Sequence, residues 1–138
     1  MSSEEDKFGA LREAATKLLA CQIHQLPCRE GDRGFHIWTQ GVIVQIVDNG
    51  NQVTIDDGTG LVIIMGLHAL ITGESWLELG KYVMITGHVM HAPSTEGDAA
   101  SVMTTKIADL SADANCEVLW WLEVMDIQLR LGDASADY

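Results

Sequence analysis

Three side chains near the start of the sequence are of the types that bind zinc, namely Cys21, His24 and Cys28. A structural zinc site needs four ligands, usually in closely spaced pairs. Here the fourth ligand is missing, the spacing matches no zinc-finger pattern, and Pro27 interrupts any helix that would align the other three. We therefore interpret them as small side chains at the end of a helix, and the sequence predicts neither a metal nor another cofactor.

Two further patterns that can carry chemistry have simpler explanations. His88 and His91 are three residues apart in a strand-like segment, so they point to opposite faces and cannot share a ligand. The segment DDGTG, from Asp56 to Gly60, is glycine-rich, but it lacks a phosphate-binding lysine and its carboxylates would repel phosphate. It is typical of a tight turn between strands. Because no nucleophile, metalloprotease or kinase motif occurs either, the sequence predicts a protein that is not an enzyme.

The composition predicts one folded, acidic domain. The 138 residues include 8 basic and 20 acidic side chains, giving a formal charge of −12, and 47% of them are hydrophobic. A disordered acidic segment would hold fewer apolar residues. No apolar run approaches the roughly 20 residues that cross a bilayer, and the first residues do not have the pattern of a signal peptide. The odd number of cysteines predicts reduced thiols in the cytosol or nucleus.

The middle of the chain predicts a small β-barrel. Five strand-like segments are separated by turn signals and one longer connection, and they lie at Ile37–Val47, Val53–Ile55, Leu61–Met65, Lys81–His91 and Ser101–Leu110. Gly41 and Gly87 interrupt the two long strands, where a glycine indicates a bulge or a bend. Such a layout favours the five-stranded OB-fold, with an SH3-like barrel as the structural alternative.

Helices are predicted on both sides of the barrel. Apolar residues from Phe8 onwards recur at helical spacing, which predicts a short N-terminal helix over about 9–20. A second helix is expected over 114–131, with Asp113 or Ser111 as its N-cap. The chain is thus divided into an N-terminal extension (1–34), the barrel (35–112), the C-terminal helix (113–131) and a tail (132–138).

The C-terminal helix has two apolar stripes, whereas packing on a barrel requires only one. One stripe consists of Trp120, Val124, Ile127 and Leu131, and the other of Val118, Trp121, Leu122, Met125 and Leu129. Two stripes predict two contacts, one with the barrel and one with a partner protein. The sequence does not distinguish which stripe makes which contact.

Binding of single-stranded nucleic acid, as in replication protein A, is the alternative function. OB-folds bind single strands through a basic groove with stacking aromatic side chains. Residues 34–129 contain two basic and twelve acidic residues, and the second and third strands contain no aromatic residue. Both features weigh against that function.

Five segments follow one another along the chain: WTQGVIV from Trp38, IDDGTG from Ile55, GKYVMITGHV from Gly80, IADLS from Ile107 and WxLEVxDI from Trp120. Together, over about residues 35–130, they resemble the RecQ-mediated genome instability protein 2 family. The resemblance implies a small OB-fold subunit of the complex between a Bloom-type RecQ helicase and topoisomerase III.

That resemblance also implies a partner and a place of action. Such a subunit is non-catalytic, forms a heterodimer with an OB-fold scaffold of the RecQ-mediated genome instability protein 1 type, and binds little or no nucleic acid. The complex dissolves double Holliday junctions in the nucleus, during recombination, replication and DNA repair. We expect the scaffold to contact the C-terminal helix at Val118, Trp120, Trp121, Leu122, Val124, Met125, Ile127 and Leu131.

Overall fold

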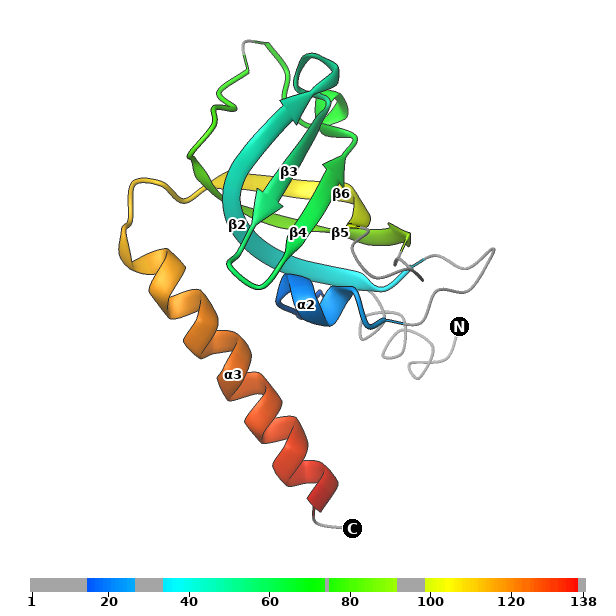
Figure 1. The fold of residues 1–138 in the computed structure, drawn as a ribbon, viewed down its shortest axis with the longest axis vertical. Coiled ribbons are helices and arrows are strands. Elements are labelled where there is room, and N and C mark those ends of the chain that lie inside the picture. Colours follow the sequence, from blue (N-terminus) through cyan, green and yellow to red (C-terminus); the bar gives the residue numbers. More distant parts are fainter. Residues whose placement is uncertain (1–14, 27–33, 74, 92–98, 137–138) are drawn as a thin grey trace, which may run out of the picture.

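The computed structural model describes residues 15–26, 34–73, 75–91 and 99–136. Their centre is a β-barrel, from which a long C-terminal helix projects (Figure 1). The barrel strands are β2 (His36–Val47), β3 (Gln52–Asp56), β4 (Leu61–Met65), β5 (Tyr82–His91) and β6 (Ala100–Asp109). Short 3-10 helices, η1 (Asp48–Gly50) and η2 (Leu67–Ala69), follow β2 and β4. All five predicted strands are therefore confirmed, with ends that differ by about one residue.

The strands close into a barrel because β2 pairs with two neighbours. Its second half pairs with β3, while its first half pairs with β5, so the order β2-β3-β4-β6-β5 returns to β2. The β4–β6 pairing is parallel and the other barrel pairings are antiparallel. This strand order is that of the predicted OB-fold and not of the SH3-like alternative.

The glycines inside the long strands lie where two backbones approach closely. The β5–β6 register shifts between Thr86 and Gly87, and a Cβ on Gly87 would collide with the carbonyl oxygen of Met103. A Cβ on Gly41 would lie 3.0 Å from the carbonyl oxygen of Asp56, while the β2 bulge itself comes later, between Ile43 and Gln45. The bulge predicted at Gly87 is present, but its extra residue is Thr105 of the facing strand β6, whereas Gly41 serves a close approach instead.

The N-terminal segment differs from its prediction. Residues 9–14 lie outside the described residues, and 15–19 are not helical, because Thr16–Lys17 form a short strand, β1, parallel to β2. A short helix is present, α2, but it covers only Ala20–Ile23. Helical spacing was misleading here. Leu18 packs on the barrel core and Leu19 packs in a second cluster, and an extended chain can place two neighbouring leucines in different clusters as well as a helix can.

The C-terminal helix, α3, covers Asn115–Ala136 and so continues past Leu131, where the sequence predicted its end. The carboxylate of Asp113 accepts a hydrogen bond from the backbone N–H of Asn115 (3.0 Å), which makes Asp113 the N-terminal cap. Ser111 has another role, because its hydroxyl accepts a hydrogen bond from the N–H of Tyr82 (2.9 Å). In the described ranges, no helix combines the length and apolar character needed to cross a membrane.

Candidate functional site

One side of α3 is packed against the protein's own barrel. Trp120 and Val124 are 1% and 0% exposed, and both belong to a small second core with Leu19. Trp38 of β2 packs against the same cluster. The barrel core proper lies on the other side of β2 and includes Ala20 and Ile23 of α2, so it is α3 that is held to the barrel by a separate hydrophobic contact.

Polar and aromatic contacts fix the direction of α3. The Nζ of Lys17 in β1 lies 3.1 Å from a carboxylate oxygen of Glu123 and 4.6 Å from the ring centre of Trp38. Such partly exposed contacts each contribute about 1 kcal/mol or less. Next to Glu123 in sequence, the half-buried indole of Trp121 lies against Gly58 in the turn between β3 and β4.

The opposite side of α3 is apolar and exposed. We call it the exposed seam of α3, and it consists of Val118 (65% exposed), Leu119 (48%), Leu122 (58%), Met125 (54%) and Leu129 (67%). Four of these residues are spaced by four, three and four positions, which is the spacing with which one helix packs along another. All the charged side chains described on α3 are acidic: Glu117, Glu123 and Asp126.

The structure separates the eight residues that the sequence assigned to partner binding. Val118, Leu122 and Met125 are exposed, Trp121 and Ile127 are half-buried, and the side chain of Leu131 lies outside the described part. Trp120 and Val124 must be corrected, because their contacts are made inside the chain and leave no surface for a partner. Leu119 and Leu129 are exposed neighbours that the prediction left out, although the spacing of four, three and four marks Leu129.

The turn between β3 and β4 positions α2. A carboxylate oxygen of Asp57 accepts a hydrogen bond from the N–H of Ala20 (2.7 Å), and the hydroxyl of Thr59 accepts one from the N–H of Cys21 (3.1 Å). These two side chains bind the first N–H groups of a helix that has few of its own hydrogen bonds. The segment is the turn that its composition predicts, and it is also a cap for α2, which its composition does not indicate.

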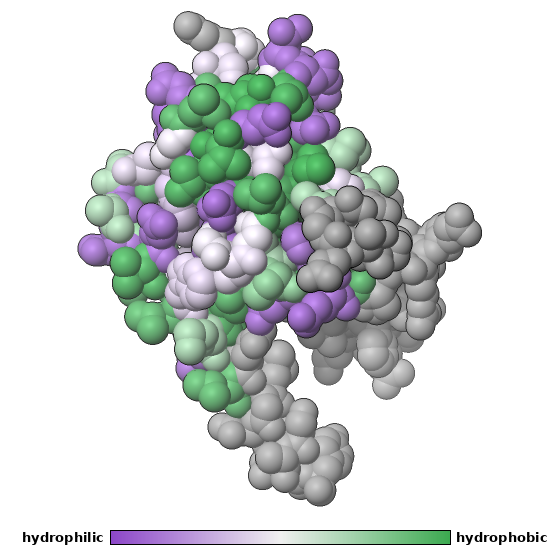
Figure 2. Space-filling model, in the orientation of Figure 1, coloured by the Kyte–Doolittle hydropathy of each residue, from purple (hydrophilic) through white to green (hydrophobic). Residues whose placement is uncertain are grey.

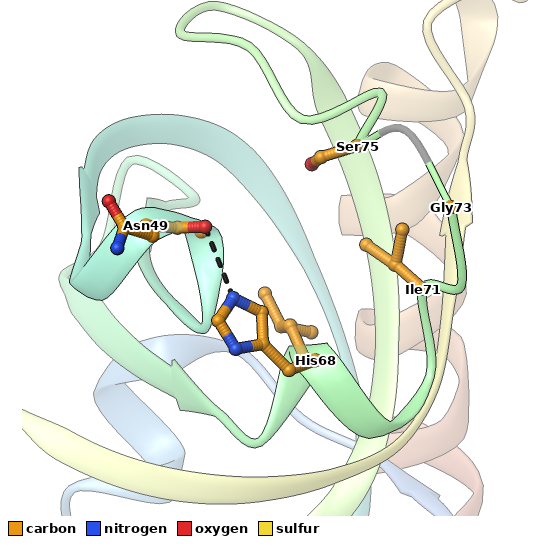
Figure 3. Close-up of a pocket in the computed structure, with 7 residues that line it drawn as sticks. Asn49, His68, Ile71, Gly73 and Ser75 are labelled. Atoms are coloured by element: carbon orange, nitrogen blue, oxygen red, sulfur yellow. Dashed lines mark hydrogen bonds between the residues drawn. The ribbon is translucent and has the colours of Figure 1, made fainter.

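The described residues contain no group of three or more His, Cys, Asp or Glu side chains that could hold a metal ion. Of the three zinc candidates, Cys28 lies outside the described residues, and His24 Nε2 makes a hydrogen bond with the carbonyl oxygen of Leu61 (2.9 Å). A small surface pocket lies between η1 and the loop after η2, where His68 Nε2 is 3.1 Å from the carbonyl oxygen of Asn49 (Figure 3). This hydrogen bond joins η2 to η1.

The strands on which OB-folds bind oligonucleotides have no basic or aromatic side chain. Neither β3 nor β4 contains Lys, Arg, Phe, Tyr or Trp, and η1 begins with Asp48. The connection between β5 and β6, the other usual contact, falls mostly in residues 92–98, outside the described part. The described portion of this surface lacks the cations that neutralise phosphates.

Comparison with known proteins gives the family. A model of RecQ-mediated genome instability protein 2 matches residues 14–128, from β1 into α3. The chain belongs to the RecQ-mediated genome instability protein 2 family. The protein of that name from Gallus gallus is 33% identical over 92 residues, which are 66% of this chain and 64% of that protein. The Mus musculus protein is 34% identical over 95 residues, 69% of this chain and 60% of that protein. The matches thus span less than two thirds of these relatives.

Solved structures with the same fold come from two kinds of assembly. A chain of the Stn1–Ten1 complex of S. pombe superposes with a TM-score of 0.66 at 17% identity, over 90% of this chain and 98% of that one. A chain of a replication protein A heterotrimer bound to single-stranded DNA gives 0.61 at 18% identity, over 85% and 97%. At such low identity these likenesses show the fold, an OB barrel followed by a helix.

Proposed function

We propose that this protein is a non-catalytic OB-fold subunit that forms a heterodimer through α3 with an OB-fold scaffold of the RecQ-mediated genome instability protein 1 type. The pair stabilises an assembly of a RecQ-family helicase with topoisomerase III in the nucleus, where the assembly dissolves double Holliday junctions. Membership of the RecQ-mediated genome instability protein 2 family, which concerns genome stability, supports the identity of the partners.

The observation that carries the proposal is the exposed seam of α3. Its five large apolar side chains are each 48–67% exposed along one side of the helix. Contiguous apolar surface of this kind marks interaction sites, because leaving it in water costs about 25 cal/mol for every Å². Trp120 and Val124 on the opposite side already pack on the barrel, so the seam is the side that remains for a partner.

The chemistry of the seam describes the helix that would cover it. Spacing of four, three and four residues fits a second helix lying nearly parallel to α3, with Leu122 and Met125 near the middle of the contact. Since the charges described on α3 are negative, we expect Lys or Arg beside the apolar residues of the scaffold's helix. The named relatives with this fold come from multi-subunit assemblies, which is consistent with this arrangement.

The test is a double substitution in the seam, Leu122→Glu with Met125→Glu, in the full chain co-expressed with the scaffold. Both side chains are more than half exposed, so the subunit alone should keep its circular dichroism spectrum and thermal unfolding midpoint. Co-purification with the scaffold should be lost. Normal co-purification of the folded double variant with the scaffold would contradict the proposal.

The matched control is Leu79→Glu, which places a charge on a loop residue that is 66% exposed and distant in sequence from α3. This variant should co-purify with the scaffold as the wild type does. A substitution of Trp120 would be uninformative here, because it would disturb the packing of α3 on the barrel and not the seam alone.

Single-strand binding of the replication protein A type is less well supported, because no cation lies on β3 or β4. Fluorescence anisotropy with an oligothymidine probe at low salt decides it. Micromolar binding that weakens with salt would favour that alternative.

A further inference from the structure

A second exposed apolar surface lies on the strands of the barrel. Side chains alternate along each strand, so Val62, Ile64 and Val102 fill the core while their neighbours point outward. Except for Ser101, the outward neighbours are apolar as well. We call this surface the methionine face, and it consists of Val44 (46% exposed), Leu61 (43%), Met103 (39%) and the half-buried Ile63 and Met65.

Strand register makes this face contiguous. Met65 of β4 is directly opposite Met103 of β6, and Ile63 lies one step along, opposite Ser101. Met103 reaches over the end of β4, because a Cβ on Gly66 would lie 2.6 Å from its sulfur. Val44 is the residue left without a partner in the β2 bulge. In Figure 2, hydrophobic surface gathers over the upper part of the barrel, where Figure 1 places β2, β3 and β4.

The charges that border the methionine face are negative. Asp56 is directly opposite Leu61 in the β3–β4 ladder, and Asp48 begins η1 at the end of β2. The lysines within the described residues lie elsewhere: Lys17 and Lys81 make ion pairs with Glu123 and Asp109. Lys106 lies beyond the β4–β6 ladder, which ends at Met103, and faces Thr86 of β5 instead.

We propose that the methionine face binds a segment of a partner protein that carries apolar side chains together with Lys or Arg. Methionine side chains are flexible and polarisable, so Met65 and Met103 can adapt to apolar groups of different shape. Asp48 and Asp56 favour a basic segment and repel a phosphate backbone. A second copy of this chain does not suit the face, because each copy carries a net charge of −12.

Side chains, not backbone, make this contact. β3 is paired on both sides, with β2 and β4, and β4 is paired with β3 and β6. Neither strand has a free edge to which a peptide could add as a further strand. Affinity therefore depends on the apolar side chains and on the basic residues of the segment, which distinguishes this face from the helix-binding seam of α3.

The experiment uses the full chain labelled with ¹³C at the methionine methyl groups. The probe is a short synthetic peptide in which Leu alternates with Lys and Ser, and the comparison peptide carries Glu in place of Lys. With the basic peptide, the methyl signals of Met65 and Met103 should shift and saturate. Met84, which is buried, and Met125, which lies in the exposed seam of α3, should not move. An unmoved Met65 and Met103, a shift at Met125 alone, or equal binding of the Glu peptide would overturn the proposal.

Variants distinguish binding at the methionine face from general attraction between an acidic protein and a basic peptide. Met103→Glu should weaken binding of the peptide about tenfold, equivalent to about 1.4 kcal/mol. Leu122→Glu adds the same charge in the exposed seam of α3 and should not weaken it. If Met103→Glu is unstable, Val44→Glu tests the same face at a more exposed position. An oligothymidine that shifts Met65 and Met103 would instead identify a nucleic-acid surface. Because Met103→Glu leaves the seam of α3 intact, it should retain the scaffold, so the two proposals fail separately.

Discussion

Trp121 of α3 lies against Gly58 in the turn between β3 and β4, so that a Cβ on Gly58 would be 3.3 Å from the indole Cζ2. The turn thus supports α3 through Trp121 and α2 through Asp57, which accepts a hydrogen bond from the N–H of Ala20. The direction in which α3 presents its exposed seam depends on this contact as well as on Trp120 in the second core.

Gly58→Ala should destabilise the protein by about 1–3 kcal/mol, because Gly58 has a φ of +89° and its new methyl group would press on Trp121. The matched control is Gly80→Ala. Gly80 has the same φ, but a Cβ there would meet no atom within 4 Å. Urea denaturation measures both free energies of unfolding, and the larger loss should belong to Gly58→Ala.

The difference between the two glycine variants should come from the indole. In a Trp121→Ala background, Gly58→Ala and Gly80→Ala should therefore have nearly equal costs. If the difference persists in that background, the indole of Trp121 is not the cause of the extra cost of Gly58→Ala.

Much of the barrel could be predicted from the sequence because period-two patterns and turn residues act locally. The β4 strand was predicted at its observed bounds, and the glycine interrupting β5 indicated a bulge, which lies in the facing strand β6. The predicted N-terminal helix was wrong over residues 15–19, because Thr16 and Lys17 pair with Ile37 and Trp38, a distant contact that overrides helical spacing.

The candidate interface shows the same limit. Two apolar stripes on α3 are visible in the sequence, but the choice between them depends on Leu19 and Trp38, which lie far earlier in the chain. Helical periodicity carries no information about such distant neighbours. The cap that Asp57 and Thr59 provide for α2 was missed for the same reason.

Trp120→Ala should destabilise the isolated subunit by about 3–5 kcal/mol, because it removes the largest fully buried side chain from the contact between α3 and the barrel. Leu122→Ala, in the exposed seam, should change the free energy of unfolding by no more than about 0.5 kcal/mol. Trp120→Phe should cost less than Trp120→Ala, because the Nε1 of Trp120 has no hydrogen-bond acceptor among the described residues. Urea denaturation measures all three, and equal losses for Trp120→Ala and Leu122→Ala would contradict the assignment of the two stripes.

Tyr82→Phe should cost about 1–3 kcal/mol at neutral pH. The hydroxyl of Tyr82 donates a hydrogen bond to the buried Oε1 of Gln40 (3.0 Å), and the phenylalanine would leave that oxygen without a donor. A Gln40→Leu variant removes the oxygen as well. Combined with Tyr82→Phe, it should recover part of the loss seen in free energies of unfolding.

The same tyrosine should make the protein sensitive to alkali. Burial first, and then the negative charges of Glu117 and other nearby groups, raise the pKa of Tyr82 well above its ordinary value. The folded state therefore retains a proton that the unfolded chain loses above about pH 10. Stability from this group is complete below that pH and falls as the pH rises further. The gap between the wild type and Tyr82→Phe should narrow from pH 9 to pH 11, and a constant gap would show that Tyr82 ionises alike in both states.

Asp109 should make the stability of the protein fall at acid pH, whereas Tyr82 makes it fall at alkaline pH. Its pKa is lowered mainly by hydrogen bonds from Ser111, first the backbone N–H at 2.9 Å, and then by Lys81, whose Nζ lies 3.1 Å away. Stability from this carboxylate is present above the ordinary pKa of about 4 and is lost as the pH falls through its lower folded value. Asp109→Asn should therefore be less stable than the wild type at pH 7, with a gap that closes below about pH 4. Because the backbone donor comes first, Lys81→Met should leave the pKa of Asp109 below its ordinary value, as carboxyl ¹³C shifts can measure. A return to the ordinary value in Lys81→Met would show instead that the lysine is the main cause.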